Sequence, residues 1–306
     1  MATTFTGEPT LTRIADGVHV YQQPDGGWCL NNAGVLAGGG RTVLVDTAAT
    51  QERAQQLRTF TVAATGTAPS AIINTHAHGD HTFGNFVFPE ALVLAHERTR
   101  REAERVGLHL TGLWPDVEWG DIELVLPHLT FTEPLAMSFG ELDVELVSFE
   151  SAHSACDTAL WLPRQRVLFA GDLVMSGVTP FLLTGSVAGL RSALIRLGEF
   201  GPAVVVPGHG PVGGPELLDE MRDYLDWLTE LARVGLAEGL SPLQVARRAD
   251  LGRFAGLVDS ERLAPNLFRA YDEASPDSAG VGVEVDVDEM VAAMVDLHGG
   301  MPACHA

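Results

Sequence analysis

The most informative segment of the sequence is a cluster of metal-binding side-chain types directly after a short apolar strand. Residues 75–81 read Thr-His-Ala-His-Gly-Asp-His, which places His76, His78, Asp80 and His81 within six residues. Imidazole nitrogen is a good ligand for zinc and other transition metals, and a carboxylate adds charge balance. A single histidine is usually structural, but four such groups in this order predict a metal site.

Three further segments carry one metal-binding residue each, again where an apolar strand is expected to end. His153 follows the expected strand 141–149, Asp172 ends the run Val-Leu-Phe-Ala-Gly-Asp, and His209 follows the expected strand 203–206. Residues at strand exits of an α/β fold share one rim, where binding sites form. The sequence therefore predicts that these three residues join the first cluster in one site.

The elements that must position these residues alternate between strands and helices in two blocks. This order predicts an α/β fold in which two β-sheets pack face to face with helices outside. Residues 275–286 are rich in Ser, Asp and Gly and are interpreted as a linker. Strands are expected at 11–15, 18–22, 33–37, 42–46, 71–74, 92–95, 203–206 and within 129–170, and helices at 51–65, 97–106, 187–200, 217–231 and 288–297.

The composition limits the classes of function. The 306-residue chain has a formal net charge of −21, and all 19 of its basic residues are arginine. A non-specific nucleic-acid binder needs a surplus of basic residues and an anionic membrane attracts them, so neither partner is expected. The lack of lysine removes Schiff-base and lysine general-base mechanisms.

The cysteines and the N-terminus bear on the compartment. Three widely spaced cysteines predict neither a disulfide framework nor a cysteine metal site, and the first residues lack the features of an export signal. We therefore expect a cytoplasmic protein. The uncharged stretch 173–190 is interrupted by glycines and a proline, so it predicts an apolar loop beside a cleft rather than a membrane span.

The histidine loop and the three later segments, in this order and spacing, resemble the metallo-β-lactamase superfamily over about residues 10–235. The resemblance implies an αββα sandwich with two zinc ions, whose bound water has a pKa lowered from about 15.7 towards 7. By the same resemblance, His76, His78 and His153 hold one zinc, Asp80, His81 and His209 hold the other, and Asp172 bridges them.

The resemblance also assigns roles outside the ligand set. Asp46 resembles the buried aspartate that supports the histidine loop from behind. Residues 1–235 are expected to form the catalytic domain, and 236–306 a C-terminal helical extension and tail on or after that domain. For the tail at Cys304 and His305 there are two alternatives, a segment folded over the site and a disordered end, and the disordered end is the expectation.

Two departures from the β-lactamases in this superfamily bear on substrate. Asp172 stands where many of them have cysteine, which resembles glyoxalase II-like thioesterases and lactonases. Met175 stands where many have a lysine that pairs with the carboxylate of the drug, so a penicillin-like substrate loses its charge partner. His78 in place of glutamate also argues against the di-iron, oxygen-reducing branch.

A looser resemblance points to actinobacterial polyketide cyclases of the second-ring, actinorhodin-pathway type. It rests on segments 27–29, 113–117, 179–181, 185–189 and 304–306. It implies aldol ring closure and dehydration of a poly-β-ketone in antibiotic biosynthesis, with thioester cleavage as a further step. The substrate would be a small molecule presented by an acyl carrier protein, Asp80 or Asp172 would take part in proton removal, and a homodimer is compatible with this activity.

Two alternatives remain open at this stage. A di-zinc thioesterase or lactonase would use the same seven ligands, and a non-catalytic scaffold would have kept only a metal site. A large aromatic-lined cavity would favour cyclisation, whereas an open cleft with a cation would favour hydrolysis. The residues expected to line the substrate pocket are Trp28, Phe83, Trp114 and Phe181.

Overall fold

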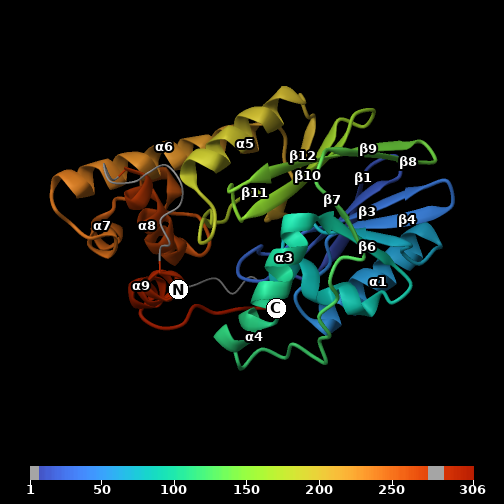
Figure 1. Ribbon diagram of the computed structural model, residues 1–306, viewed down its shortest axis with the longest axis horizontal. Coiled ribbons are helices and arrows are strands. Elements are labelled where there is room, and N and C mark those ends of the chain that lie inside the picture. The colour runs from blue at the N-terminus through green and yellow to red at the C-terminus, as the bar shows by residue number, and fades with distance from the viewer. Residues whose placement is uncertain (1–6, 275–285) are drawn as a thin grey trace.

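Two β-sheets pack face to face between two layers of helices (Figure 1). The protein is seen here in a computed structural model, which describes residues 7–274 and 286–306. This arrangement confirms the expected αββα sandwich. The predicted linker 275–286 lies outside the described residues, except for its last residue.

The first sheet contains seven strands in sequence order, β1 to β7. The first three pairs are antiparallel, and β4, β5, β6 and β7 run parallel to one another. Helix α1 (Gln51–Thr65) connects β4 to β5, and it begins at Thr50, whose side chain accepts a hydrogen bond from the amide of Arg53. The strands are β1 (Thr10–Ala15), β2 (Val18–Gln22), β3 (Ala33–Gly38), β4 (Arg41–Val45), β5 (Ala71–Ile73), β6 (Leu92–His96) and β7 (Leu129–Phe131).

The second sheet has five strands in the order β12-β11-β10-β9-β8. Strands β11 and β12 are parallel, and the other pairs are antiparallel. Strand β11 continues beyond the predicted end at Asp172, into the stretch that was expected to be a loop. The strands are β8 (Leu135–Phe139), β9 (Leu142–Glu150), β10 (Cys156–Leu162), β11 (Val167–Met175) and β12 (Val204–His209).

Alternation along the strands produces the layers. Val43 and Val45 of β4 point into the apolar core between the two sheets, whereas Leu44 points to the opposite face and packs in the cluster that contains Leu57 of α1. Successive side chains of a strand face opposite sides of a sheet, so one strand serves two cores. The same alternation in β11 sends Leu168 towards the helices on the other side.

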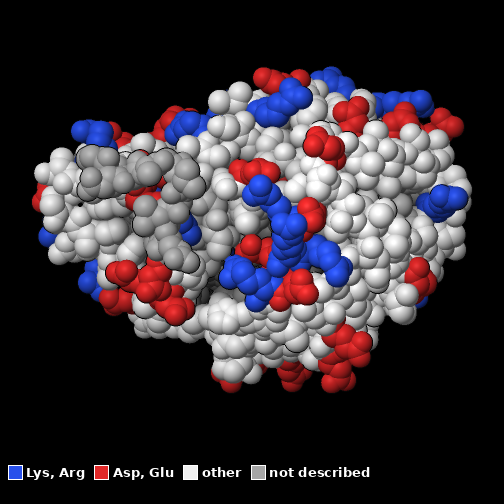
Figure 2. Space-filling model, viewed as in Figure 1, with Lys and Arg blue, Asp and Glu red and all other residues white. Residues whose placement is uncertain are grey.

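α5 and α6 pack against the outer face of the second sheet, and α7 and α8 pack against α6 on the side away from the sheet (Figure 1). α9 precedes the C-terminal tail, which ends beside α4. Arginines of α3 gather at the centre of the face in Figure 2. The helices are α2 (Gly79–Thr82), α3 (Glu97–Val106), α4 (His109–Leu113), α5 (Val187–Glu199), α6 (Glu216–Ala237), α7 (Pro242–Arg248), α8 (Leu263–Ala274) and α9 (Val287–His298), with short 3-10 turns at Phe83–Val87, Gly252–Phe254 and Ser260–Arg262.

Across the described parts of the chain, no helix combines the length and the apolar character needed to cross a bilayer.

Candidate metal centre

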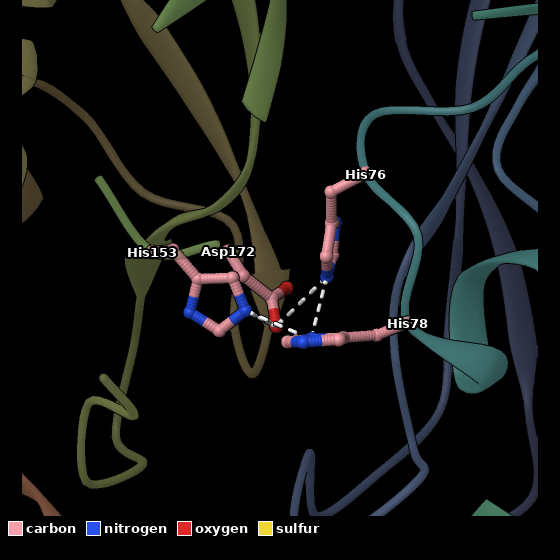
Figure 3. A group of neighbouring side chains, drawn as sticks. All are labelled: His76, His78, His153 and Asp172. Carbon is pink, nitrogen blue, oxygen red and sulfur yellow. Dashed lines mark hydrogen bonds and ion pairs between the residues drawn. The ribbon is translucent and has the colours of Figure 1, made fainter. Parts of the chain in front are cut away.

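The seven predicted ligands converge at the rim where β5, β9, β11 and β12 end. Figure 3 shows His76 and His78 from the loop after β5 facing His153 and Asp172 from the second sheet. Each residue of this group offers a ligand atom within 4.8 Å of the others, and Asp80, His81 and His209 form a second group by the same measure. The first group contains His76, His78 and His153 together with Asp172, and the second contains the other three residues without Asp172.

Asp172 lies between the two groups. Its Oδ1 is 3.1 Å from His81 Nε2, and its Oδ2 is 3.4 Å from His153 Nε2 and 3.6 Å from His209 Nε2. Oδ1 therefore faces the second group and Oδ2 lies near histidines of both groups, so the carboxylate is placed where a bridging ligand would be needed.

The second nitrogen of four histidines is already engaged, which fixes the ring orientation. The Nδ1 atoms of His153 and His209 donate to the carbonyl oxygens of Phe181 at 2.7 Å and Gly26 at 2.9 Å. His81 Nδ1 donates to Asp46 at 2.8 Å, and His76 Nδ1 lies 3.0 Å from the Thr75 hydroxyl. Each ring is left with Nε2 as its free ligand atom, the usual arrangement of metal-bound histidine.

Asp46, at the end of β4, organises the histidine loop. Its carboxylate accepts hydrogen bonds from the Thr75 amide at 2.7 Å and the Thr75 hydroxyl at 2.6 Å, as well as from His81. The side chain is buried, so these bonds are shielded from water. One carboxylate therefore holds the backbone of the loop and one imidazole together.

A second buried carboxylate, Asp157, does the same for the loop of His153, and the sequence analysis missed it. It accepts hydrogen bonds from the amides of His153 and Ser154, each at 2.9 Å, and from the Ser154 hydroxyl at 2.7 Å. Burial raises the pKa of Asp157 to about 7. The signal in the sequence is one acidic residue near the start of the otherwise apolar β10.

Glycine is required where β11 and β12 approach the site. A Cβ atom on Gly208 would lie 1.8 Å from Oδ1 of Asp172, so any other residue would displace the proposed bridging carboxylate. Gly171 has φ 52°, and its Cβ would lie 2.9 Å from the Thr75 side chain.

The donor set fits a cation. His81 Nε2 and Asp172 Oδ1 are buried without a hydrogen-bond partner among the described residues, although they are only 3.1 Å apart. Burial lowers the pKa of His153 to about 3 and also lowers those of His76 and His78, so these imidazoles are neutral and can donate a lone pair. Burial opposes the charged form of His81, but Asp172, Asp80 and Asp46 outweigh it and raise the pKa of that imidazole. A buried acceptor without a partner, together with three neutral imidazoles, is what a metal site presents before the ion binds.

Asp172 and Asp80, the carboxylates beside these imidazoles, have lowered pKa values because of the neighbouring histidines and in spite of burial. Burial alone would raise the pKa of Asp172, but His81 and His209 lower it well below its usual range. Burial likewise opposes ionisation of Asp80, and His81 and His209 outweigh it. Both carboxylates are therefore anionic at neutral pH, which suits divalent zinc.

A cavity of about 400 Å³ opens onto the ligand groups, and Asp80, Asp172 and His209 form part of its wall. All four predicted pocket residues, Trp28, Phe83, Trp114 and Phe181, line it. Most of the remaining lining is apolar, and α3, α4, α9 and the segment after β11 contribute to it. Glu102 and Arg105 of α3 and His109 of α4 add polar groups to the wall.

Sequence reasoning missed a pair of residues that meets this cavity from the C-terminal region. Arg262 is 2% exposed, and its guanidinium carbon lies 4.0 Å from the centre of the Trp28 ring and its Nη1 3.6 Å from the sulfur of Met175. A positive charge is therefore present beside Met175, but it belongs to Arg262, which lies 87 residues further along the chain. The neighbouring Glu261 accepts a hydrogen bond from the Trp28 indole at 2.7 Å.

The expectation of a disordered C-terminal end is wrong. The Trp114 indole donates to the carbonyl of Pro302 at 2.7 Å, and Arg53 donates to the carbonyl of His305 at 2.5 Å. Cys304 and Ala306 pack against the aromatic cluster that includes Trp28 and Trp114. Apolar contacts and two backbone acceptors hold the tail against the rim of the site.

Comparison with known proteins gives one family and several distant relatives. The family model described as the metallo-beta-lactamase superfamily matches residues 26–209. The chain is 29% identical over 165 residues to a metallo-beta-lactamase type 2 of Bacillus cereus, which covers 50% of this chain and 57% of that protein. It is 32% identical over 145 residues to 2,4-dinitroanisole O-demethylase subunit alpha of Nocardioides sp. (strain JS1661), covering 45% and 39% of the two chains.

Among solved structures, a metallo-beta-lactamase from Pontibacter korlensis is similar with a TM-score of 0.59 and 22% identity, covering 72% of this chain and 99% of that one. This likeness bears on the fold alone. The Bacillus and Nocardioides relatives carry names of two different activities, and each of these two is matched over less than two thirds of its length.

Proposed function

Because the chain belongs to the metallo-β-lactamase superfamily, we propose that it is a zinc-dependent cyclase that closes an aromatic ring in a poly-β-ketone. The observation that carries this proposal is the cavity of about 400 Å³, which joins the ligand groups to a wall of aromatic side chains. An enzyme for a small or highly charged substrate has no need of such a wall, because apolar lining contributes affinity for apolar surface.

Two arginines line the cavity among the described residues. Arg105 is paired with Glu102 at 2.8 Å. Arg262, the cation beside Met175, does not act as a free carboxylate receptor. Arg262 is covered by Trp28, and its Nη2 lies 2.8 Å from Asp259 Oδ2. Its charge is thereby compensated inside the protein. This arrangement supports a neutral, conjugated substrate rather than a penicillin-like anion.

The seven residues described above would hold two zinc ions, which supply Lewis acidity towards carbonyl oxygens and the negative charge of an enolate. Trp28 and Phe181 would hold the substrate chain in a folded, near-planar shape against the rim. Their rings are 5.1 Å apart and nearly perpendicular, so together they form a corner rather than a flat wall.

The carboxylates at the cavity wall provide the proton acceptor. Asp80 or Asp172 would hold the proton that leaves the methylene between two substrate carbonyls. The methylene carbon then bonds to a second carbonyl carbon, whose oxygen takes up a proton. That hydroxyl then departs as water together with the remaining hydrogen of the former methylene carbon, which leaves a carbon–carbon double bond. Enolisation of the remaining ring carbonyls gives the aromatic ring, and the apolar wall keeps bulk water away meanwhile.

We further propose that the substrate arrives as a thioester on an acyl carrier protein in the cytoplasm, and that thioester cleavage follows at the same centre. The alternative, simple hydrolysis of a thioester or lactone, would use the same ligands. What favours cyclisation is the size and aromatic character of the cavity, because a hydrolase needs only one carbonyl at the metal.

The test uses zinc-loaded protein, a partly cyclised poly-β-ketone thioester and mass spectrometry of the product. We expect loss of one water, which a His76→Ala control does not catalyse. Gain of one water with release of the thiol would make the protein a hydrolase and overturn the cyclase proposal.

A further inference from the structure

The two tryptophans of the cavity are both held by the C-terminal region. The indole N–H of Trp28 donates to Glu261 Oε1, and that of Trp114 donates to the carbonyl oxygen of Pro302, each at 2.7 Å. Both acceptors lie outside the segment 26–209 that matches the family model. The segment that supplies the predicted metal ligands therefore does not by itself fix the aromatic part of the cavity.

Trp28 is held on its face as well as at its edge. The Arg262 guanidinium stacks on the ring at 4.0 Å, and Phe181 meets it edge-on at 5.1 Å. Arg262 is itself fixed by Asp259 at 2.8 Å and by the carbonyl of Thr179 at 3.2 Å. A guanidinium on an aromatic face is attracted by the ring quadrupole, and more strongly when water is excluded.

These contacts remove the freedom that a tryptophan on a loop would otherwise have. Trp28 is 8% exposed, Trp114 is 6% exposed, and their ring centres are 5.3 Å apart. Glu261 is also buried, so its hydrogen bond to Trp28 is not exchanged for one to water. A cavity wall that is already in place before the ligand binds pays no ordering cost at that moment.

We infer that Glu261 and Arg262 are specificity-determining positioning residues, which fix Trp28 as a rigid wall that selects flat, fused-ring ligands. Neither residue needs to touch the reacting atoms. The inference deepens the proposed function: ring closure and dehydration of a poly-β-ketone give flat, fused rings, which are the ligands that a rigid Trp28 would select. The inference rests on the proposed function only for the choice of flat, fused-ring molecules as the ligand class.

The experiment measures binding to the zinc-loaded full-length protein, with no turnover. The flat probe is 2-(hydroxymethyl)anthraquinone, followed by quenching of tryptophan fluorescence and by calorimetry. The small probe is acetylacetone, a β-diketone that is able to meet the metals without reaching Trp28. Zinc content is measured for every variant.

In the variants Glu261→Leu and Arg262→Met we expect anthraquinone affinity to fall about tenfold or more, while acetylacetone affinity changes less than about twofold. Glu261→Gln should restore the anthraquinone affinity, since an amide oxygen still accepts the indole N–H. Arg253→Met is the matched control, because that guanidinium also stacks on an aromatic ring, Phe254 at 4.9 Å, but away from the cavity.

Anthraquinone binding as tight as in the unaltered protein for both variants, or an equal loss in Glu261→Gln and Glu261→Leu, would overturn the inference. If Glu261→Leu fails to fold, Arg262→Met decides, because it removes the guanidinium from the face of Trp28 and leaves both Trp28 and Glu261 in place. It should also weaken anthraquinone binding, and unchanged binding would count against the inference. A protein that fails to cyclise poly-β-ketones can still pass this test, so the two proposals fail separately.

Discussion

The metal centre and the aromatic cavity meet at one rim but are built in different ways. In the metal centre, two buried carboxylates each organise a short loop, Asp46 for the loop after β5 and Asp157 for the loop after β9. In the cavity, Trp28 and Trp114 depend on hydrogen-bond acceptors that lie 233 and 188 residues further along the chain. Short hydrogen-bonded loops set the positions of the ligands, and remote tertiary contacts set the shape of the space beside them.

This difference suggests that the two regions respond separately to substitution. A change to a ligand or to its supporting carboxylate should alter metal binding and leave the apolar wall in place. A change to the wall or to its tethers should alter ligand selection and leave the metals in place. Each of the following substitutions tests whether metal binding and ligand selection change independently.

The largest effect is expected for Asp172→Asn. The amide keeps the shape but loses the charge directed at both ligand groups, so zinc content should fall and cyclisation should drop on the order of 10³-fold. Anthraquinone affinity should stay within about threefold, because Trp28 and its tethers are untouched. Metal analysis and calorimetry check the two halves of this prediction, and a joint loss would show that the regions are not separate.

A smaller effect is expected for the two supporting carboxylates. Asp46→Asn and Asp157→Asn should each weaken zinc binding about 10- to 100-fold, the range typical of residues that orient metal ligands. Asp46 contacts a ligand side chain directly, whereas Asp157 contacts the backbone of His153 and the backbone and hydroxyl of Ser154 but no ligand side chain, so the loss should be larger for Asp46→Asn. Competition with a chromogenic zinc chelator measures both, and the reverse order would contradict this account of the two loops.

The next smaller effect is expected for Trp28→Ala, which removes one aromatic side chain from the cavity wall. Loss of the ring should weaken anthraquinone binding about tenfold, since aromatic contacts and buried area are lost together. Zinc content should not change. If zinc is lost as well, the loop before β3 supports the metal centre, for example through the Gly26 carbonyl that holds His209.

The smallest effect is expected on the arginine-rich surface of α3 (Figure 2). Arg98 pairs with Glu150 at 3.1 Å, but both side chains are more than half exposed. Exposed pairs contribute little because water and salt screen them, so Arg98→Ala should change the free energy of unfolding by less than about 1 kcal/mol. Urea denaturation checks this, and a larger loss would mean that α3 is coupled to the rim through the neighbouring His153 loop.

The sequence predicted which histidine and aspartate side chains come together better than it predicted their surroundings. His76, His78, Asp80 and His81 are adjacent in the chain, and the other three follow apolar runs that are recognisable as strands, so local patterns were enough to bring them to one rim. Asp157 left a weak signal, a single acidic residue in an apolar strand. Its partners are two backbone amides and a hydroxyl, which no residue pattern reveals.

The cavity was predictable in its side chains but not in its tethers. Trp28, Phe83, Trp114 and Phe181 stood out as large apolar residues near the motifs. The Trp114 tether, in contrast, is a backbone carbonyl at Pro302, and every residue has one. Arg262 also looks like any surface arginine until the fold buries it against Trp28 and Met175, 87 residues from the latter.

The central claim is that one rim holds two zinc ions through seven ligands. Anomalous X-ray diffraction at the zinc edge, on crystals of protein purified without chelator, tests it most directly. The account predicts one peak among His76, His78 and His153 and a second among Asp80, His81 and His209, with Asp172 between them. A single peak, or zinc bound away from these residues, would contradict it.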